Sequence, residues 1–451
     1  MIVPLLDMKE LPLAQPPLCE LSRKERIRKK IMEFLITLAV AMIGGLLMSR
    51  VAKKLSLPAV TAYLVAGLIL GPFCIGHLGI MGLGFPSLEA VEAYSLITQA
   101  ALGFIAFTIG NEFRLTQLKS MGKQAIIIGI LQAVITTVVV DIALIVLHFI
   151  KPDLISIPAA ITLGAIAAAT APAATLMVVR QYKADGPLTK LLLLVVAIDD
   201  AVGLVLFSAS FGIAKAMEQG TASITNIILE PIIEIVLSLI LGAVMGLLLH
   251  LVERFFHSRS KRLAISVGFV LLTVGLSMIK FEIGGIHCGF SLLLVCMMTG
   301  TIFCNVCDFS EELMDRVESW SVPLNILFFV ISGAELDLNI LSNPLILLLG
   351  VVYIIFRSLG KYFGADLSCR MTRCDEKITK NLGITLLPQA GVALGMALTA
   401  AQLADGPLVR NVVLFAVLVY ELVGPVMTKN ALTRAGEIKP EGKTSARTKN
   451  P

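Results

Sequence analysis

Apolar segments of about 20 residues recur along almost the whole chain, and they limit the possible folds more than any other feature. A bilayer core is about 30 Å thick, so a helix needs roughly 20 apolar residues to cross it. Such segments run from Ile31 to the neighbourhood of Ala435. Only 15% of the residues are charged, whereas soluble domains carry about 25%. We therefore expect an all-α polytopic membrane protein.

The apolar segments predict thirteen transmembrane helices. They cover residues 31–49, 57–76, 90–111, 123–149, 156–180, 187–216, 224–253, 262–280, 283–304, 318–336, 340–369, 378–403 and 408–432. In the seventh, Gly242 and Gly246 form a G-x-x-x-G pattern, which favours close helix packing. The net charge of +5 lies in loops, which argues against nucleic-acid binding.

Lysine and arginine set the expected orientation, because short cytoplasmic loops are enriched in them. Loops after odd-numbered spans hold most of these residues, for example 254–262 and 370–377. This predicts a multi-pass protein of the cell (inner) membrane, with its N-terminus outside and its C-terminus in the cytoplasm. The basic run 23–30 opposes that orientation.

The chain resembles itself at a separation of about 220 residues. Ala184-Asp-Gly-Pro-Leu188 matches Ala404-Asp-Gly-Pro-Leu408, and an acid-containing helix follows each match. The separation is seven spans, and an odd number means that the two halves cross the membrane in opposite directions. Inverted-topology repeats of this kind are common in secondary transporters. The expected organisation is an N-terminal segment 1–30, a transmembrane domain 31–433 and a disordered tail 434–451, with repeat one at 31–216, a linker helix at 224–253 and repeat two at 262–433.

Proline interrupts two spans at repeat-equivalent places, Pro172 and Pro388. Proline removes a backbone donor and clashes with the preceding helical turn. Inverted-repeat transporters bind ions near such breaks. We therefore expect two crossing broken helices, with Thr170, Pro172 and Thr175 in one break and Pro388, Gln389 and Gly391 in the other.

Asp199 and Asp200 lie together inside the apolar segment 191–207. A charged side chain at mid-bilayer costs several kcal/mol, so two adjacent carboxylates indicate a function. Carboxylates bind Na⁺ and H⁺, and burial disfavours their charged form. We expect these two side chains to bind the ion and the proton, with Na⁺ at Asp200, Asp199 and Thr175.

Two basic residues could pair with one of these aspartates. Arg357 follows six apolar residues in span eleven and is the expected partner. Lys361, one turn further on, is the alternative, although a lysine there is expected to extend towards the surface.

Other acidic residues are weaker candidates. Glu421 occupies the repeat position that mirrors Asp200, and Asp141 is deep in span four. Glu112 and Glu335 lie near helix ends, where solvation or capping is commoner.

At these residues the chain resembles the monovalent cation:proton antiporters, in particular the branch with bacterial Na⁺/H⁺ antiporters and the membrane domains of glutathione-gated K⁺ efflux systems. The resemblance covers nearly all of residues 31–433. It rests on the segments Tyr63–Pro72, Phe107–Leu115, Ala169–Thr175, Asp199–Asp200 and Pro388–Gly395.

The resemblance implies a homodimer with a dimerisation domain and a mobile core domain. It also implies that Asp200 binds the ion while Asp199 pairs with a basic residue on span eleven. The Arg-Ser-Leu-Gly register assigns that place to Arg357, where family members with two aspartates often carry lysine. Arginine keeps its proton, whereas a buried lysine can lose it, so the register does not predict the unequal, electrogenic exchange of those members.

The predicted function is a secondary active transporter that exchanges Na⁺, Li⁺ or K⁺ for H⁺ by alternating access. A K⁺/H⁺ antiporter, a Na⁺-coupled organic-anion symporter of similar fold and a membrane sensor that transports nothing remain alternatives. No nucleophile–base pair or metal-ligand cluster stands out in the sequence, so we expect neither an enzyme nor a cofactor.

Overall fold

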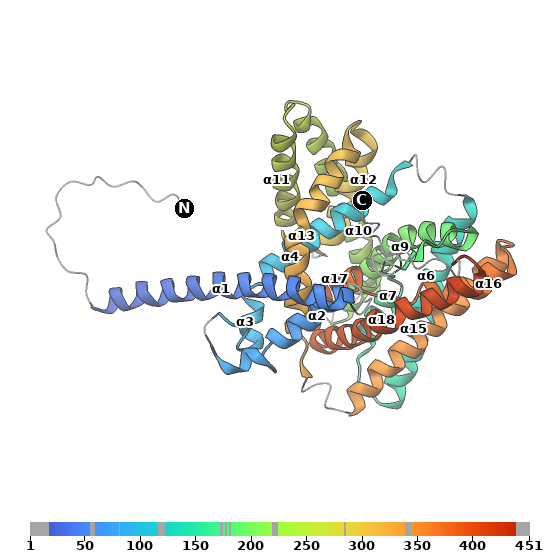
Figure 1. Ribbon diagram of the computed structural model, residues 1–451, viewed down its shortest axis with the longest axis horizontal. Helices are drawn as coiled ribbons and strands as arrows, with labels where there is room; N and C mark the ends of the chain where they lie inside the picture. The colour runs from blue at the N-terminus through green and yellow to red at the C-terminus, as the bar shows by residue number, and fades with distance from the viewer. Residues whose placement is uncertain are drawn as a thin grey trace, which may run out of the picture.

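Helices form almost all of the described chain and coincide with the apolar segments (Figure 1). The computed structural model describes residues 18–54, 59–80, 82–115, 122–171, 175, 178–179, 182–218, 224–283, 286–338 and 344–438. Pro172 lies outside these residues, and so do the side chains of Glu112 and Asp200.

Thirteen apolar helices can be counted in the described chain, in agreement with the number of predicted spans. Eight are long enough to cross a membrane: Ile31–Ala52 of α1 (Leu18–Lys54), Ala59–Leu78 with α2 (Ala59–Leu70) and η1 (Ile75–Leu78), α6 (Lys123–Ile150), Ile232–Glu253 of α10 (Ile224–Glu253), α11 (Arg259–Ser277), α13 (Ser310–Ala334), α15 (Pro344–Met371) and α18 (Gly406–Ala435). The shorter five are α4 (Ser95–Ile109), α7 (Ile157–Ala167), the start of α9 (Pro187–Glu218), α12 (Leu292–Val306) and α17 (Gly391–Ala400). The described chain also contains three small elements, α3 (Leu88–Glu92), η2 (Gly110–Phe113) and α16 (Glu376–Thr385).

A short hairpin departs from the all-helical prediction. Strands β1 (Phe281–Ile283) and β2 (Ile286–Cys288) pair antiparallel, with Ile283 opposite Ile286. The intervening sequence Gly284-Gly285 is typical of a two-residue hairpin connection. The predicted ninth span therefore begins later than expected, at Leu292 of α12.

The long helices divide into two bundles by their contacts. The first bundle contains α1, α2, α4, α10, α11, α12 and α13, and the second contains α6, α7, α9, α15, α16, α17 and α18. Contacts within each bundle far exceed those between them, apart from the consecutive helices α9 and α10. The two bundles are therefore joined mainly along α9 and α10.

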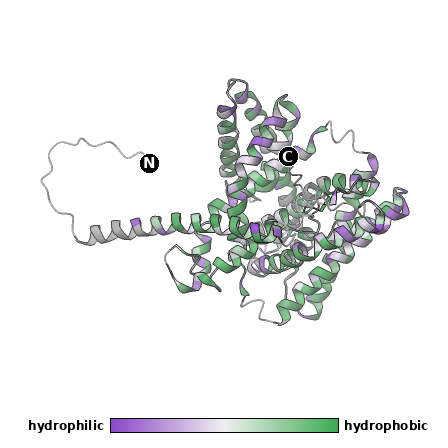
Figure 2. Cartoon of the chain, viewed as in Figure 1, coloured by the Kyte–Doolittle hydropathy of each residue, from purple (hydrophilic) through white to green (hydrophobic). Residues whose placement is uncertain are grey.

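Apolar side chains cover the outer faces of both bundles. Leu47 of α1, Ile240 of α10 and Phe363 of α15 are all more than half exposed. Figure 2 shows hydrophobic residues over much of α15 and over the part of α1 that adjoins the bundle. Apolar faces of this kind are stable against the hydrocarbon of a bilayer, whereas their exposure to water would be unfavourable.

The internal repeat is visible in the helices. Helices α6 and α15 each contain 28 residues and begin at Lys123 and Pro344. Each repeat supplies helices to both bundles: α1, α2 and α4 match α11, α12 and α13, while α6, α7 and α9 match α15, the α16–α17 pair and α18. This helix order is the one expected for two repeats that are seven spans apart.

Glycines allow close helix contacts in the first bundle. A Cβ atom on Gly242 would lie 2.5 Å from the Val295 carbonyl oxygen, and one on Gly246 would lie 2.7 Å from that of Thr299. The G-x-x-x-G pattern therefore packs α10 directly against α12, as its sequence predicted. Gly300 of α12 is tighter still, since its Cβ would meet the Phe107 carbonyl oxygen at 2.1 Å.

Candidate functional site

Two helices of the second bundle are interrupted where proline was expected to break them. Helix α7 ends at Ala167, and residues 169–171 follow in non-helical conformation. In the second repeat α16 ends at Thr385, and α17 begins at Gly391 beyond Pro388 and Gln389. The second interruption includes Pro388 and Gln389, whereas the first is described up to Ala171, directly before Pro172.

The two breaks contact each other directly. The Ala171 N–H donates to the Pro388 carbonyl oxygen at 2.8 Å. The Gln389 amide donates to the Ile166 carbonyl oxygen at 3.0 Å. Each break therefore satisfies backbone groups of the other, which a bilayer interior requires because it offers no water as a partner.

A buried ion pair lies beside this crossing. The Lys361 Nζ of α15 is 2.7 Å from Oδ2 of Asp199 in α9, and both side chains are fully buried. Ion pairs in a low-dielectric interior cost several kcal/mol per ion to desolvate and persist only with further hydrogen bonds. The site must therefore supply other polar partners to both groups.

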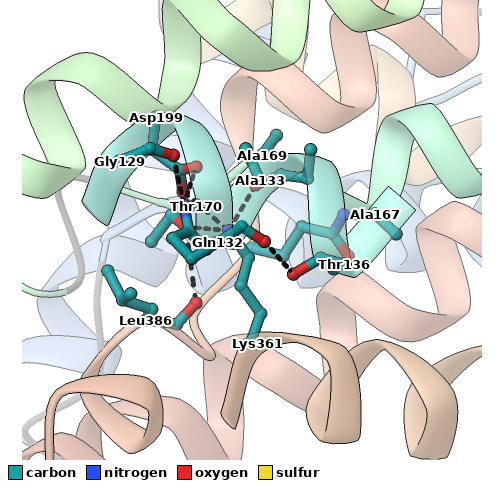
Figure 3. A network of polar contacts seen from close by, with 12 residues as sticks. Gly129, Gln132, Ala133, Thr136, Ala167, Ala169, Thr170, Asp199, Lys361 and Leu386 are labelled. Atoms are coloured by element: carbon teal, nitrogen blue, oxygen red, sulfur yellow. Dashed lines mark hydrogen bonds and ion pairs between the residues drawn. The ribbon is translucent and has the colours of Figure 1, made fainter. Parts of the chain in front are cut away.

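Those partners come from α6 and from the first break (Figure 3). Gln132 of α6 donates its amide to Asp199 Oδ1 and accepts from Lys361 through Oε1 at 3.1 Å. Thr170 donates to Asp199 Oδ2 and accepts from Lys361 at 2.9 Å. Lys361 also donates to the Ala168 carbonyl oxygen. One network therefore joins α6, α9, α15 and the broken end of α7.

The predicted pairing of Asp199 with Arg357 is wrong, and so is the expected surface position of Lys361. Lys361 lies one turn closer to Asp199 along α15 and is fully buried. Neither the longer apolar run before Arg357 nor the Arg-Ser-Leu-Gly register determines which basic residue reaches Asp199. Periodicity alone does not tell two buried basic residues apart when both face the same break.

Arg357 instead holds the two breaks together. Its guanidinium donates to the carbonyl oxygens of Ala167, Ala169 and Leu387 at 3.0, 2.7 and 2.7 Å. These carbonyls are freed by the breaks, and the planar fork of arginine can reach several acceptors at once. The Tyr420 ring covers its other side, 4.4 Å from the guanidinium carbon. Arg357 thus serves as a structural cation at the crossing.

Two buried side-chain oxygens on the broken segments have no hydrogen-bond partner among the described residues. They are Thr175 Oγ1, after the first break, and Gln389 Oε1, within the second. Buried polar atoms are normally satisfied, so each exception needs an explanation. Hydroxyl and amide oxygens suit a hard cation. Asp200 follows Asp199 in the backbone of α9, but its side chain lies outside the described part of the structure.

A cavity of about 860 Å³ lies between the bundles, further along α9. Phe207, Ser208 and Phe211 line it from α9, and residues 398–402 line it from the end of α17. Leu96, Gln99 and Leu102 line it from α4 in the first bundle. Phe207 is eight residues from Asp199, which is about 12 Å along a helix. The cavity therefore approaches the carboxylate network from one side of the membrane.

The weaker acidic candidates have different surroundings. Glu421 is buried and accepts from Thr61 of α2 at 3.2 Å, while its Oε1 has no partner among the described residues. Asp141 packs against Gly164 of α7, and its Oδ1 is likewise unpartnered there. Glu335 is not solvated as expected, because it is 5% exposed and lies 3.5 Å from Nη1 of Arg410.

The sequence reasoning missed Gln132, which contacts both members of the ion pair. Its signal was an amide in the apolar stretch 125–135 of α6. A buried amide needs both donor and acceptor partners, and this one finds them in Asp199 and Lys361. The Ala168 carbonyl carries no signal of its own in the sequence.

The fold is similar to that of solved sodium proton antiporters. The structure of MjNhaP1 from Methanocaldococcus jannaschii at pH 8 matches with a TM-score of 0.70 and 19% sequence identity, over 92% of this chain and 100% of that one. An electron-microscopy map of the same antiporter matches with a TM-score of 0.65, over 91% and 99% of the two chains at 19% identity. Both matches are likenesses of fold.

A curated relative and a family model match the sequence itself. K(+) efflux antiporter 5 from Arabidopsis thaliana is 33% identical over 105 residues, which are 23% of this chain and only 16% of that protein. The family model described as "Sodium/hydrogen exchanger, transmembrane" matches residues 38–434. With its broken helices crossing beside a buried carboxylate, the chain belongs to the sodium/hydrogen exchanger family.

Proposed function

We propose that this multi-pass membrane protein exchanges Na⁺ for H⁺ by alternating access, and that Asp200 and Asp199 carry the exchange. The observation that supports this most is the buried network of Asp199, Lys361, Gln132 and Thr170 beside two crossing helix breaks. A site of this kind places carboxylate, hydroxyl and carbonyl oxygens together inside the membrane. The family of the chain supports the same reaction class.

Competition for carboxylate oxygens would couple the two ions. A carboxylate that binds Na⁺ has no stable place for a proton, and a protonated one attracts Na⁺ poorly. In this proposal Asp200 binds the cation, and Thr175 contributes its hydroxyl, which has no hydrogen-bond partner among the described residues. Glu421 and Asp141, each with an oxygen that lacks a partner in the described part of the chain, remain secondary candidates for carrying protons.

In this proposal the ammonium group of Lys361 supplies a second exchangeable proton at the site. An ammonium group can release its proton to become neutral, which a guanidinium effectively cannot do. When the cation reaches the site, Lys361 would lose its proton and free Asp199 to take part in binding. Because lysine and not arginine faces Asp199, we expect unequal numbers of protons and cations to be exchanged, which makes the exchange electrogenic.

The two bundles are suited to a relative movement. The second bundle contains both breaks and the ion pair, whereas the first contains neither. We propose that the second bundle moves against the first, and that the first forms the contact surface of a homodimer. Lys215 and Lys280 line the cavity between the bundles. In the predicted orientation they face the outside, so the cavity would be the outer access route.

One observation favours K⁺ as a second candidate ion. The curated relative with 33% identity over 105 residues is named a K(+) efflux antiporter. The same network would serve K⁺, because its ligands are oxygens of the same kinds. Ion preference therefore has to be measured with each cation in turn.

The test uses purified protein in proteoliposomes that contain a pH-sensitive dye. Na⁺, Li⁺ and K⁺ are added separately to the wild type, Asp200→Asn and Asp315→Asn, the last being an exposed aspartate on α13. We expect cation-driven proton movement in the wild type and the Asp315 variant, and none in the Asp200 variant. A voltage-sensitive dye in the same vesicles reports whether exchange moves net charge.

Two results would count against the proposal. Normal exchange by the folded Asp200→Asn protein would remove the site assignment. An absence of proton movement with all three cations in the wild type would favour a symporter or a non-transporting sensor instead.

A further inference from the structure

Helix α15 ends in a turn that brings two cysteines together. The Cys374 N–H donates to the Cys369 carbonyl oxygen at 2.9 Å, and the Arg373 N–H donates to that of Arg370 at 3.2 Å. Between them Arg373 adopts a left-handed conformation, with φ of +55°. This pair of bonds defines a Schellman motif, which places the side chains of its first and last residues against each other. Here those residues are Cys369 and Cys374.

The two thiols lie at the first and last positions of this turn, and they differ in access. The Cys369 side chain is fully buried, whereas that of Cys374 is partly exposed. Cys369 and Cys374 are joined across the turn by the 2.9 Å bond from the Cys374 N–H to the Cys369 carbonyl oxygen, and the side chains at these two positions of the motif face each other. An oxidant from the water phase would therefore meet Cys374 first, with Cys369 directly behind it.

Polar groups hold the Cys374 sulfur in place. Gln124, at the start of α6, donates its amide to Cys374 Sγ at 2.9 Å and to the Thr372 carbonyl oxygen at 3.2 Å. The Thr372 hydroxyl lies 3.5 Å from the same sulfur. The thiol pair is thus tied to α6 as well as to α15.

Helices α6 and α15 both lead from this turn to the ion pair. Gln132 and Lys361 are each eight residues along their helices from Gln124 and Cys369, a distance of about 12 Å. These two helices pack along each other more extensively than any other pair in the described chain. A change at the thiols therefore acts on two elements that position Asp199.

We propose that Cys369 and Cys374 form a reversible dithiol–disulfide site, oxidised by hydrogen peroxide, whose state regulates transport. The transport part rests on the proposed exchange function. A disulfide bond of about 2.05 Å would pull Cys374 towards α15 and take its sulfur away from Gln124. Residue 374 leads directly into α16, so the second crossover would be held differently against α6.

The chemistry balances with one peroxide molecule. The Cys374 thiol gives up its proton as its sulfur attacks a peroxide oxygen, the O–O bond breaks, and a sulfenic acid and hydroxide form; the released proton converts the hydroxide to one water. The Cys369 sulfur then attacks the Cys374 sulfur, the S–O bond breaks, and the hydroxide leaves with the Cys369 proton as a second water. The two thiols lose two electrons and peroxide gains them. Dithiothreitol reverses the change by thiol–disulfide exchange.

The test treats the full chain in proteoliposomes with hydrogen peroxide and then with dithiothreitol. Peptide mass spectrometry measures the 369–374 disulfide, and the pH-dye assay measures exchange. The variants are Cys369→Ala, Cys374→Ala and, as a matched control, Cys74→Ala, an exposed cysteine elsewhere. We expect the disulfide and a loss of at least about twofold in exchange rate in the wild type and in Cys74→Ala, both reversed by reduction. Neither change should occur in the other two variants.

The remaining outcomes test the disulfide site and its effect on transport separately. Failure to find the disulfide after peroxide overturns the site, whatever the transport result. A disulfide with an unchanged rate in an exchanging protein overturns the regulation. If the reduced protein exchanges no cation, the proposed function fails, while mass spectrometry still decides whether the thiols pair.

Discussion

Glu218 and Glu437 occupy equivalent places in the two repeats, and each binds the matching Ala-Asp-Gly-Pro-Leu segment of the other repeat. Glu437 accepts from the backbone N–H groups of Leu188 and Thr189 at 2.6 and 2.7 Å. Glu218 accepts from the Ala404 N–H with both oxygens at 3.1 Å. The five-residue match in the sequence thus marks two reciprocal contacts, at the starts of α9 and α18.

We expect Glu437→Ala to destabilise the protein by about 1–2 kcal/mol, because it removes a carboxylate from the N-terminus of α9. Glu218→Ala should cost less, since that carboxylate contacts one N–H group outside the helix. Thermal unfolding in detergent measures both, with the exposed Glu311→Ala as control. Equal stability of the Glu437 and Glu311 variants would contradict the capping role.

Lys361→Met should destabilise the protein by about 3–5 kcal/mol, because it leaves the Asp199 carboxylate buried without its cation. Asp199→Asn in the same chain should recover part of that loss by removing the uncompensated charge. The control is Lys380→Met, since Lys380 pairs with Glu376 on the exposed side of α16. The assignment fails if Lys361→Met unfolds at the same temperature as Lys380→Met.

Arg357→Lys keeps the charge but removes the fork that reaches three carbonyl oxygens. Hydrogen bonds to charged groups contribute about 1.5–3 kcal/mol each, so a loss of about 2 kcal/mol or more is expected. Exchange should slow as well, because the breaks lose their common partner. Arg370→Lys on the same helix, which is largely exposed, should change neither unfolding nor exchange. Similar behaviour of the two variants would argue against the role of Arg357.

Gly300→Ala should destabilise the first bundle by about 2 kcal/mol or more, because its Cβ would overlap a backbone oxygen that cannot move away. Gly268→Ala on α11 is the matched control, since nothing lies within 4 Å of its Cβ. That variant should gain about 0.5–1 kcal/mol from helix propensity. Unfolding temperatures in detergent compare them, and a harmless Gly300→Ala would show that α4 and α12 are further apart.

Much of the architecture could be predicted because a bilayer leaves few choices. Long apolar runs have to be helices, so their number followed from the sequence. The breaks were expected where Pro172 and Pro388 stand at repeat-equivalent places, and proline alone would not have located them, since Pro323 and Pro425 lie inside continuous helices. The hairpin 281–288 did not, because it directly precedes the apolar helix α12, and the predicted ninth span joined the two in spite of Glu282 and His287.

The site could be predicted only in part. Asp199 was evident, since an acid within an apolar run needs a partner. The identity of that partner was not, because Arg357 and Lys361 are one turn apart and both lie buried against the same break. Which of them reaches Asp199 depends on how α15 is rotated against α6 and α9, and that rotation is set by packing over the whole helix.

The ion pair also has a consequence for how the protein is made. Lys361 follows Asp199 by 162 residues, so the ribosome synthesises Asp199 well before its partner Lys361. Until α15 has entered the membrane, Asp199 lies in the newly inserted first repeat without a counter-charge, and the first break lacks the guanidinium that gathers its carbonyls. Maturation of the first half therefore has to wait for the second, and a nascent chain stopped before α15 should be recognised and degraded as incomplete.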